Sequence, residues 1–302
     1  MKRLWIILLA FALLLAACGG EPGGTAPSAT EAPPAAALPT PTPIPIIPTP
    51  TPLPPPPTPT PLPTPTPAPE EAEATPAPAV TEVMVEIPAG PFTMGMDSGD
   101  PNEAPAHEVD LPTFMMDKFE VTNADFAVFV EATGYETYAE KEGRTGWRAA
   151  YNEGKDNHPV VYVTFDDALA YCTWAGKRLP TEAEWEKAAR GPEGFLFPWG
   201  NEWDPTKANV KESGLRGTAT VGSYPPNGYG LCDTAGNVWE WVDSPYEAYP
   251  GSDYQDSKYS PDLRGLRGGG WFDSEEQVRA TNRNAGDPTT TANDDIGFRC
   301  AK

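Results

Sequence analysis

The sequence predicts an α+β domain with much irregular backbone over residues 81–302. Three segments carry the signals of helices, several shorter ones carry those of strands, and the rest is rich in Gly, Asn, Asp, Trp and Tyr without a long hydrophobic period. Proline separates this domain from what precedes it. Of the 39 prolines, 23 lie in residues 1–80, and the 16 that remain are an ordinary number for one folded unit.

Residues 1–17 have the pattern of a secretory signal peptide. Two basic residues precede an apolar run from Leu4 to Ala17, which is too short to span a bilayer. The run ends in Leu-Ala-Ala before Cys18 and so resembles a bacterial lipobox, in which cleavage before the cysteine is followed by its lipidation. We expect an extracytoplasmic lipoprotein, anchored to the membrane through Cys18 at the cell surface or envelope. The alternative is an ordinary signal peptide with a coincidental cysteine.

Residues 18–80, which begin with the lipidated cysteine, are expected to form a disordered stalk. They consist mostly of Pro, Thr, Ala and Gly, with Thr-Pro repeats around residues 40–67. Almost no side chain there can be buried, so folding would not offset the entropy of ordering the chain. Prolines at this density favour an extended helix of about 3.1 Å per residue, which gives a reach of about 190 Å. A docking site for proline-recognition modules is the alternative.

Short strands are expected at the start of the domain. Residues 82–87 and 88–95 have the pattern of two strands broken by a turn, and a third extended region runs from His107 to Val121.

Three helices follow. The first covers about residues 123–132, between a Thr122 cap and Gly134, and the second follows Asp166 and stops at Gly176.

The third helix has the clearest signals. Thr181 and Glu184 form a capping box, and Gly191 ends the helix. The eight tryptophans after the signal peptide are expected to be core residues more often than ligand platforms.

Charge excludes several classes of function. Residues 81–302 hold 21 − 2 = 19 basic and 43 − 5 = 38 acidic side chains, a net charge of 19 − 38 = −19, so nucleic acid is not an expected partner. The chain has only two histidines, His107 and His158, which excludes three-histidine metal sites and disfavours a Ser/His/Asp hydrolase.

A series of motifs carries a more specific signal. In chain order they are FTMG (92–95), FEVTN (119–123), HPVVYV (158–163), GKRLPTEAEWE (176–186), PWGN (198–201), GNVWEW (236–241), RGGGW (267–271) and GFRC (297–300). Together they resemble the formylglycine-generating enzyme family, also called the sulfatase-modifying factor family, over essentially all of residues 82–302. The resemblance implies a fold similar to that of C-type lectins, with little regular secondary structure.

The resemblance also implies where a catalytic site would lie. Active members oxidise a sulfatase cysteine to formylglycine with oxygen and with copper held by two cysteines, five residues apart, after an RGGS block. Here Gly270 stands in place of the serine, and Asp273 and Val278 stand in place of the cysteines. Because soft thiolates select cuprous copper, neither copper nor this oxidation is expected. The iron-dependent branch of the family, whose histidines come from an additional helical domain, is also not expected.

The family resemblance implies a disulfide between Cys172 and Cys300, which export of the chain permits. Cys232 would then be unpaired, and a buried thiol is expected there more than a reactive nucleophile.

Structural calcium is expected in the GNVWEW loop by the same resemblance. The ligands would be side-chain oxygens of Asp233 and Glu240 with backbone carbonyls of Gly236 and Val238. The alternative is that Asp233 caps a turn and Glu240 pairs with an arginine.

A second calcium site would fall on Asn209 and Val210, with Leu215. Its acidic ligand is replaced by Ser213, which makes it the weaker assignment.

The former catalytic region is expected to be a ligand-binding surface, with Trp271, Asp273, Asn282 and Arg283 facing the ligand. Fold analogy and the polar loop 287–295 support this expectation. The catalytic alternative is an acid and base pair of Asp273 with Glu275 or Glu276, and a solvated acidic turn is the simplest alternative.

Three functions follow from these observations. Recognition of a glycan, a peptide or an envelope protein is preferred, and it requires an open cleft lined by Trp271 and Asn282. A scaffold in an envelope complex would instead show an exposed apolar patch. Retained or altered oxidase chemistry would show perturbed acids or a metal beside Asp273.

Overall fold

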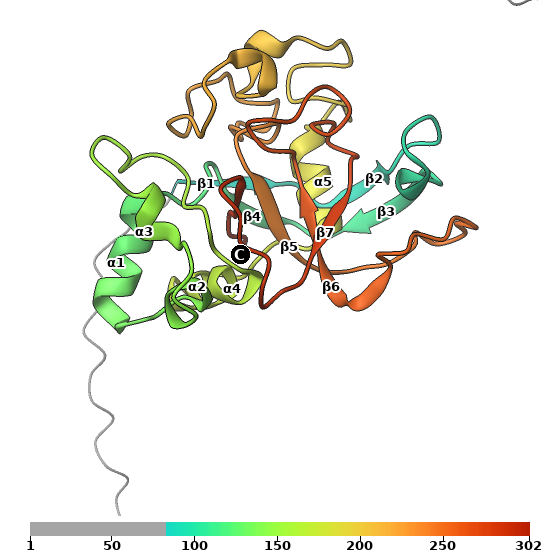
Figure 1. Ribbon diagram of the computed structural model, residues 1–302. Helices are drawn as coiled ribbons and strands as arrows, with labels where there is room; N and C mark the ends of the chain where they lie inside the picture. Colours follow the sequence, from blue (N-terminus) through green and yellow to red (C-terminus); the bar gives the residue numbers. More distant parts are fainter. Residues whose placement is uncertain (1–82) are drawn as a thin grey trace, which may run out of the picture. The chain divides into compact units, whose positions relative to one another are not determined.

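The computed structural model describes residues 83–302. The predicted signal peptide (1–17), the predicted lipidation at Cys18 and the predicted stalk (18–80) lie outside these residues. The described part combines short helices with small sheets, which confirms the predicted α+β class (Figure 1). None of its helices is long and apolar enough to cross a membrane.

Two small antiparallel sheets lie at the start of the domain. Strand β1 (Met84–Ile87) pairs with β4 (Phe114–Asp117), and β2 (Gly90–Met94) pairs with β3 (His107–Leu111). The two predicted strands are confirmed. The third predicted region is divided into β3 and β4 by Pro112, which lies between them and has no amide hydrogen to donate to a ladder.

The third sheet carries the candidate site. It consists of β5 (Trp239–Tyr246), β6 (Ser260–Arg267), β7 (Asn284–Gly286) and β8 (Ile296–Gly297) in the order β7-β6-β5-β8. The pair β5–β8 is parallel and the other pairs are antiparallel. Figure 1 shows β5, β6 and β7 side by side, with long loops between them.

The three predicted helices are present. They are α1 (Asn123–Thr133), α4 (Phe165–Trp174) and α5 (Glu182–Arg190), and each begins at a threonine whose hydroxyl accepts a backbone N–H three residues on. Two further one-turn helices are α2 (Tyr138–Lys141) and α3 (Trp147–Ala150). Three turns of 3-10 helix also form, η1 (Pro101–Glu103), η2 (Pro205–Lys207) and η3 (Lys211–Ser213).

The main core joins the helices to the end of the chain. The Phe126 ring of α1 is fully buried and packs against Trp147, Tyr171 and Phe298 at centroid distances of 5.2, 5.9 and 6.4 Å. The predicted disulfide between Cys172 of α4 and Cys300 lies within the same core. Trp147 is therefore a core residue, as the sequence analysis expects for most of the tryptophans.

The last residues of the chain are held by β4. The Asp117 amide donates to the Cys300 carbonyl, and Met115 and Lys302 exchange amide-to-carbonyl hydrogen bonds in both directions. In Figure 1 the C-terminus accordingly lies beside β4. The remaining cysteine of residues 83–302, Cys232, is unpaired and buried, and burial raises the pKa of its thiol, which fits a structural role.

Reduction of the disulfide is expected to destabilise the domain by about 3–5 kcal/mol, because the bridge closes a long loop in the unfolded chain. Thermal unfolding with and without reductant measures the effect. The double variant Cys172→Ala/Cys300→Ala should unfold at a lower temperature and lose its response to reductant, whereas Cys232→Ala should keep that response. An unchanged melting temperature after complete reduction would contradict this expectation.

Candidate ligand-binding site

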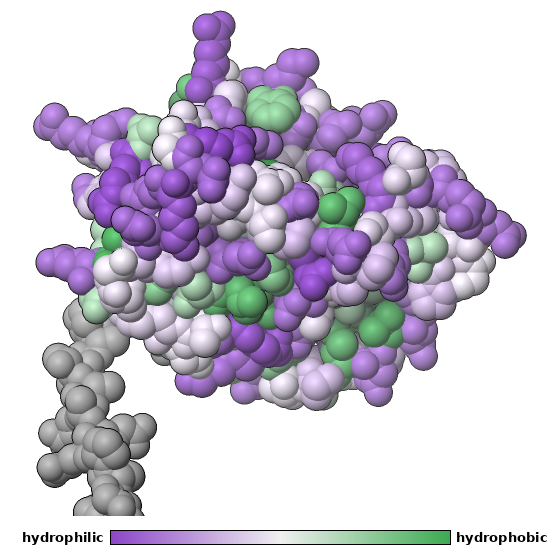
Figure 2. Space-filling model, turned by 60° about the horizontal axis from the view of Figure 1, so that its bottom comes forward, coloured by the Kyte–Doolittle hydropathy of each residue, from purple (hydrophilic) through white to green (hydrophobic). Residues whose placement is uncertain are grey.

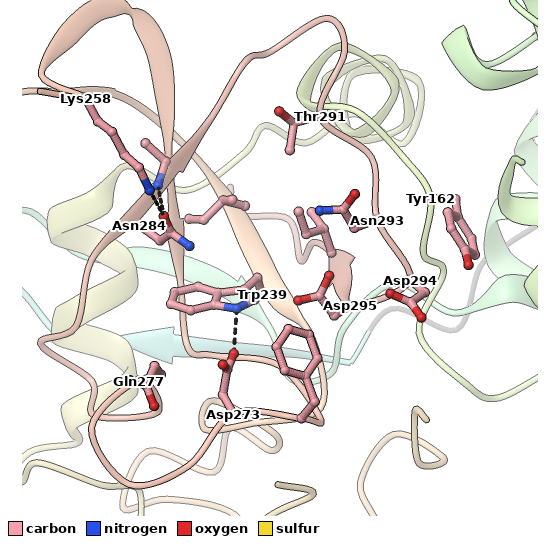
Figure 3. Close-up of a pocket in the computed structure, with 14 residues that line it drawn as sticks. Tyr162, Trp239, Lys258, Asp273, Gln277, Asn284, Thr291, Asn293, Asp294 and Asp295 are labelled. Atoms are coloured by element: carbon pink, nitrogen blue, oxygen red, sulfur yellow. Dashed lines mark hydrogen bonds between the residues drawn. The ribbon is translucent and has the colours of Figure 1, made fainter. Parts of the chain in front are cut away.

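A pocket of about 530 Å³ lies beside the third sheet. Its walls come from the first residue of β5, the strands β6, β7 and β8, and the loops that precede and follow β7 (Figure 3). The residues that line it are Tyr162, Trp239, Lys258, Leu266, Phe272, Asp273, Gln277, Asn284, Ala285, Thr291, Asn293, Asp294, Asp295 and Ile296. The loop at which the family resemblance implies a catalytic region therefore borders a cavity.

Asp273 forms one wall of this pocket in a fixed orientation. Its Oδ2 atom accepts a hydrogen bond from the Trp239 indole at 2.8 Å (Figure 3). The same atom accepts a second one from the Gly270 amide at 2.9 Å. Burial raises the pKa of this carboxyl above its ordinary value, and the two donors act in the opposite direction. Asp273 is therefore open to the pocket rather than sealed beneath loops, which keeps both binding and catalysis possible.

Asp295 is the most deeply placed acid of the pocket. Its exposed fraction is 5%, and its backbone carbonyl accepts a 2.7 Å hydrogen bond from the Trp239 amide. Burial raises the pKa of its side chain to about 6, and the nearby charges of Asp273 and Asp294 act in the same direction. The catalytic alternative of the sequence analysis paired Asp273 with Glu275 or Glu276, but both glutamates are exposed and neither lines the pocket.

Gly270 leaves the room that Asp295 occupies. A Cβ atom at position 270 would lie 3.0 Å from the Cβ and 3.1 Å from the Oδ2 of Asp295. The glycine that stands in place of the family's serine thus allows a carboxyl group to approach this point of the backbone.

Val278, the other degenerate position, does not face the pocket. It is fully buried in an apolar cluster with Phe197, Ala208, Val210 and Ala235. Its Cγ1 would lie 2.6 Å from a Cβ at Gly269, so this part of the loop is tightly packed. Position 278 therefore serves packing, whereas position 273 serves the pocket.

The prediction that Asn282 and Arg283 face a ligand is wrong. Arg283 is 5% exposed, forms a two-pronged ion pair with Glu182 at 2.7 and 2.9 Å, and lies over the Tyr249 ring at 3.9 Å. Asn282 is also buried and donates to Asp100 at 3.2 Å. Both side chains already have partners inside the domain, because a buried charge or amide requires them.

Trp271 lies beside the pocket without lining it. Its indole donates to the Asp294 carbonyl at 3.2 Å, and its ring meets the Phe272 ring edge-on at a centroid distance of 5.4 Å. The predicted cleft lined by Trp271 and Asn282 is therefore replaced by one around Asp273 and Asp295.

Several pocket residues were not singled out by the sequence analysis as ligand-facing. Trp239 and Tyr162 lie within the motifs GNVWEW and HPVVYV, but nothing in those motifs indicates a cavity. Lys258 and Asn284 lie outside every motif, and Lys258 donates to the Asn284 side chain at 3.1 Å. Tyr162 has a positive φ of 60°, which few non-glycine residues adopt, and no sequence rule indicates it. Asp295 belongs to the polar loop 287–295, which was expected to matter only as a whole.

The residues proposed for calcium form a buried cluster with Arg299. Both oxygens of Glu240 accept from the Arg299 guanidinium at 2.7 Å, and one also accepts from the Trp185 indole at 2.7 Å. Asp233 accepts from the Gly222 amide, as a turn cap would. Both contacts are those of the metal-free alternative, so Glu240 fits poorly as a calcium ligand.

Asp233 fits a cation better. Burial is the main cause that raises its pKa to about 6, and Glu120, also fully buried beside it, has a raised pKa from burial and from the charges of Asp233 and Glu240. Three carboxyls thus share one arginine. The second predicted calcium site, at Asn209 and Val210, has no carboxyl group among its predicted ligands. Its Asn209 Oδ1 already accepts a hydrogen bond from the Ser213 hydroxyl at 2.9 Å.

Comparison with known proteins agrees with the motifs. Residues 69–302 match the family described as the sulfatase-modifying factor enzyme 1-like domain. The formylglycine-generating enzyme of Mus musculus is 38% identical, with 72% of this chain and 74% of that protein covered. The inactive C-alpha-formylglycine-generating enzyme 2 of Bos taurus is also 38% identical, with 72% and 87% covered. The structure of PvdO from Pseudomonas aeruginosa superposes with a TM-score of 0.59 at 32% identity, covering 72% of this chain and 93% of that one.

Asp295→Asn is expected to stabilise the domain near pH 7.5 and to change it little near pH 4. The folded pKa of about 6 lies above the ordinary 3.8, so the stability linked to this carboxyl is complete below pH 3.8 and is lost as the pH rises to about 6. This difference in pKa corresponds to about 3 kcal/mol at most. Urea unfolding at both pH values measures it. The exposed control Asp262→Asn should show no such pH dependence, and equal behaviour of the two variants would contradict the expectation.

Proposed function

The chain belongs to the sulfatase-modifying factor family, and from that premise we propose that it recognises a polar ligand through the pocket around Asp273 instead of oxidising a cysteine. The observation that carries the proposal is the Trp239 to Asp273 hydrogen bond, which directs a carboxyl group into a cavity at a position where active relatives have a thiol. The family includes proteins named as inactive, so loss of the oxidase activity has a precedent.

The proposed setting of this domain is the outside of a bacterial cell. Lipidation at Cys18 would attach the chain to a membrane, and residues 18–80 would hold the domain away from the surface. A glycan, a peptide or an envelope protein is the class of ligand that such a position would meet.

The pocket chemistry supports a polar ligand. Amide, hydroxyl and carboxyl groups line the cavity together with Trp239, Phe272 and Leu266, which is the mixture that binds a ligand by a few directed hydrogen bonds and apolar contacts. A cavity of about 530 Å³ has room for a sugar ring or a long side chain.

The scaffold alternative has less support. In the described part of the chain, the exposed large hydrophobic residues are Val83, Leu215, Tyr254 and Phe272, which come from separate segments, and Phe272 belongs to the pocket. The face shown in Figure 2 is mostly hydrophilic, with small separate apolar areas. No broad apolar surface on that face suits a permanent partner.

A second candidate function is acid and base catalysis by Asp273 and Asp295. The raised pKa of Asp295, at about 6, is the property expected of a general acid near neutral pH. Burial is the largest cause of that shift and needs no catalytic role to explain it, so recognition remains the first proposal. Turnover of a bound ligand, lost in Asp295→Asn while binding persists, would favour catalysis.

Calcium is proposed in a restricted form, with Asp233 as the side-chain ligand. Calcium should raise the melting temperature of the full-length chain, a chelator should lower it, and Asp233→Ala should remove the response, because a cation would offset the buried charge beside Arg299. Asp262→Asn serves as the control. If wild-type stability is the same with calcium and with chelator, the calcium proposal is wrong.

A thermal-shift screen tests the recognition proposal. The full-length chain, purified in detergent, is measured against cell-wall glycans, free sugars, peptides and a cysteine-containing sulfatase peptide. A ligand present at a hundred times its Kd should stabilise the fold by about 2.7 kcal/mol, and Asp273→Asn should weaken that effect. Formation of an aldehyde on the sulfatase peptide, detected by mass spectrometry, would overturn the proposal.

A further inference from the structure

Building on the proposed function, we propose that the pocket receives a basic side chain, a lysine ammonium or an arginine guanidinium, presented by a polypeptide. The inference names the class of ligand for the site described above. It rests on the charge of the cavity, on one buried acid to which no other described residue donates a hydrogen bond, and on a second pocket that shares a wall with the first.

The charge of the cavity selects a cation. Three carboxyl groups line it, those of Asp273, Asp294 and Asp295, against one basic group, Lys258, which donates to Asn284. Within residues 83–302 no three His, Cys, Asp or Glu side chains are grouped to hold a metal ion, and this applies to these acids and to the cluster around Asp233 alike. An organic cation, which is larger and can donate several hydrogen bonds, fits them better.

Asp295 provides the specific contact. The residue is 5% exposed and lines the cavity. In the described part of the chain no other residue donates a hydrogen bond to its carboxyl group. Figure 3 shows this carboxyl group directed into the space between Trp239 and Asp294. Its own backbone amide is the donor that acts on it, and its remaining acceptor positions are open to an incoming N–H group from the cavity.

Asp273 is positioned to act with Asp295. Its Oδ2 is held by the Trp239 indole and the Gly270 amide, whereas its Oδ1 has no hydrogen-bond donor among the described residues. The two carboxyl groups interact electrostatically, since Asp273 contributes to the raised pKa of Asp295. A cation bound between them would be attracted by both.

The apolar part of the lining suits the stem of a long basic side chain. Leu266, Ile296 and the Trp239 ring lie at the same cavity as the acids, and Phe272 is 49% exposed at its border. Lysine and arginine bury their methylene groups against such surfaces while the charged end makes polar contacts. An exposed ring near a cation also adds attraction through its face.

A neighbouring pocket favours a polypeptide over an isolated amine. Tyr162 lines both the main cavity and a second one of about 180 Å³, whose other lining residues include Tyr138, Arg144 and Thr145. Arg144 is exposed and lies over the Tyr138 ring at 5.8 Å, and no carboxyl group of residues 83–302 pairs with it. A chain that crosses Tyr162 would place a basic residue against Asp295 and an acidic or amide group near Arg144.

Capped peptides of fixed central residue test the proposal. Libraries with Lys, Arg, norleucine or Glu at the centre and randomised flanks are bound to the full-length chain in detergent, and binding is followed by fluorescence anisotropy. Capping removes the charges of the peptide termini, so the libraries differ in charge only through the central side chain. The Lys or Arg library should bind at least about tenfold more tightly than the norleucine library, equivalent to about 1.4 kcal/mol.

Variants assign that preference to the pocket. Asp295→Asn should remove the preference for a basic residue, and Gly270→Ser should reduce it because the new side chain crowds the Asp295 carboxyl. The exposed Asp262→Asn is the matched control and should bind as the wild type does. Unchanged melting behaviour of each variant at low pH shows that it is folded.

The pH dependence gives an independent readout. The acidic and basic groups that face Asp295 across the cavity are Asp273, Asp294, Tyr162 and Lys258. Because the pKa of Asp295 is about 6 and a cation binds its ionised form, affinity for the basic peptides should rise from pH 5 to pH 7 and then level. Affinity of Asp295→Asn should stay nearly constant over this range.

The outcomes separate this inference from the proposed function. Equal binding of the norleucine and lysine libraries, with loss in Asp273→Asn, would overturn the cation class while leaving recognition in place. Binding of neutral glycans but of no peptide would overturn the polypeptide class and again leave recognition. Absence of binding to every library and to glycans would overturn both.

Discussion

Trp239 is the residue on which the candidate site depends. Its backbone amide binds the carbonyl of Asp295, its indole binds the carboxyl of Asp273, and it pairs with Ile296 where β5 and β8 meet. Two loops that are remote in sequence are thereby fixed to one point of a sheet. The indole N–H must find an acceptor when it is buried, and the acceptor it has also orients the wall of the pocket. Preorganisation of this kind lowers the entropy lost when a ligand binds.

Buried ion pairs hold the frame around that point. Arg267 is fully buried and contacts Glu182 and Glu186, and Arg299 is fully buried against Glu240. Such groups require nearly complete hydrogen bonding, because an unpaired charge in the interior is very unfavourable. Short strands and irregular loops make few backbone ladders, so side-chain pairs of this type supply much of the fixed geometry between elements. They also explain why polar residues near the pocket, such as Arg283, are structural.

The sequence predicted the helices better than the site. Capping threonines at Thr122 and Thr181 and the stop at Gly134 are local signals, and the structure has helices that begin and end there. The disulfide of Cys172 with Cys300 and the family followed from motifs. The sheet order β7-β6-β5-β8 could not be predicted, since β7 and β8 are held to it by only three and two paired residues. The burial of polar side chains could not be predicted either. Asp273, Asn282 and Arg283 are all polar, and only their packing in the fold shows that Asp273 faces a cavity whereas Asn282 and Arg283 do not.

The first and the last described residues are both hydrogen-bonded at β4. Val83 accepts from the Lys118 amide just after β4, and Lys302 accepts from Met115 within it. Strand spacing then puts these ends on the order of 15 Å apart. A domain whose ends are that close can be inserted into a loop of another protein, or rejoined by a short linker and reopened elsewhere, with little disturbance of its host or of itself. The position of β4 therefore makes this fold a transferable unit, one that could carry its pocket into unrelated chains.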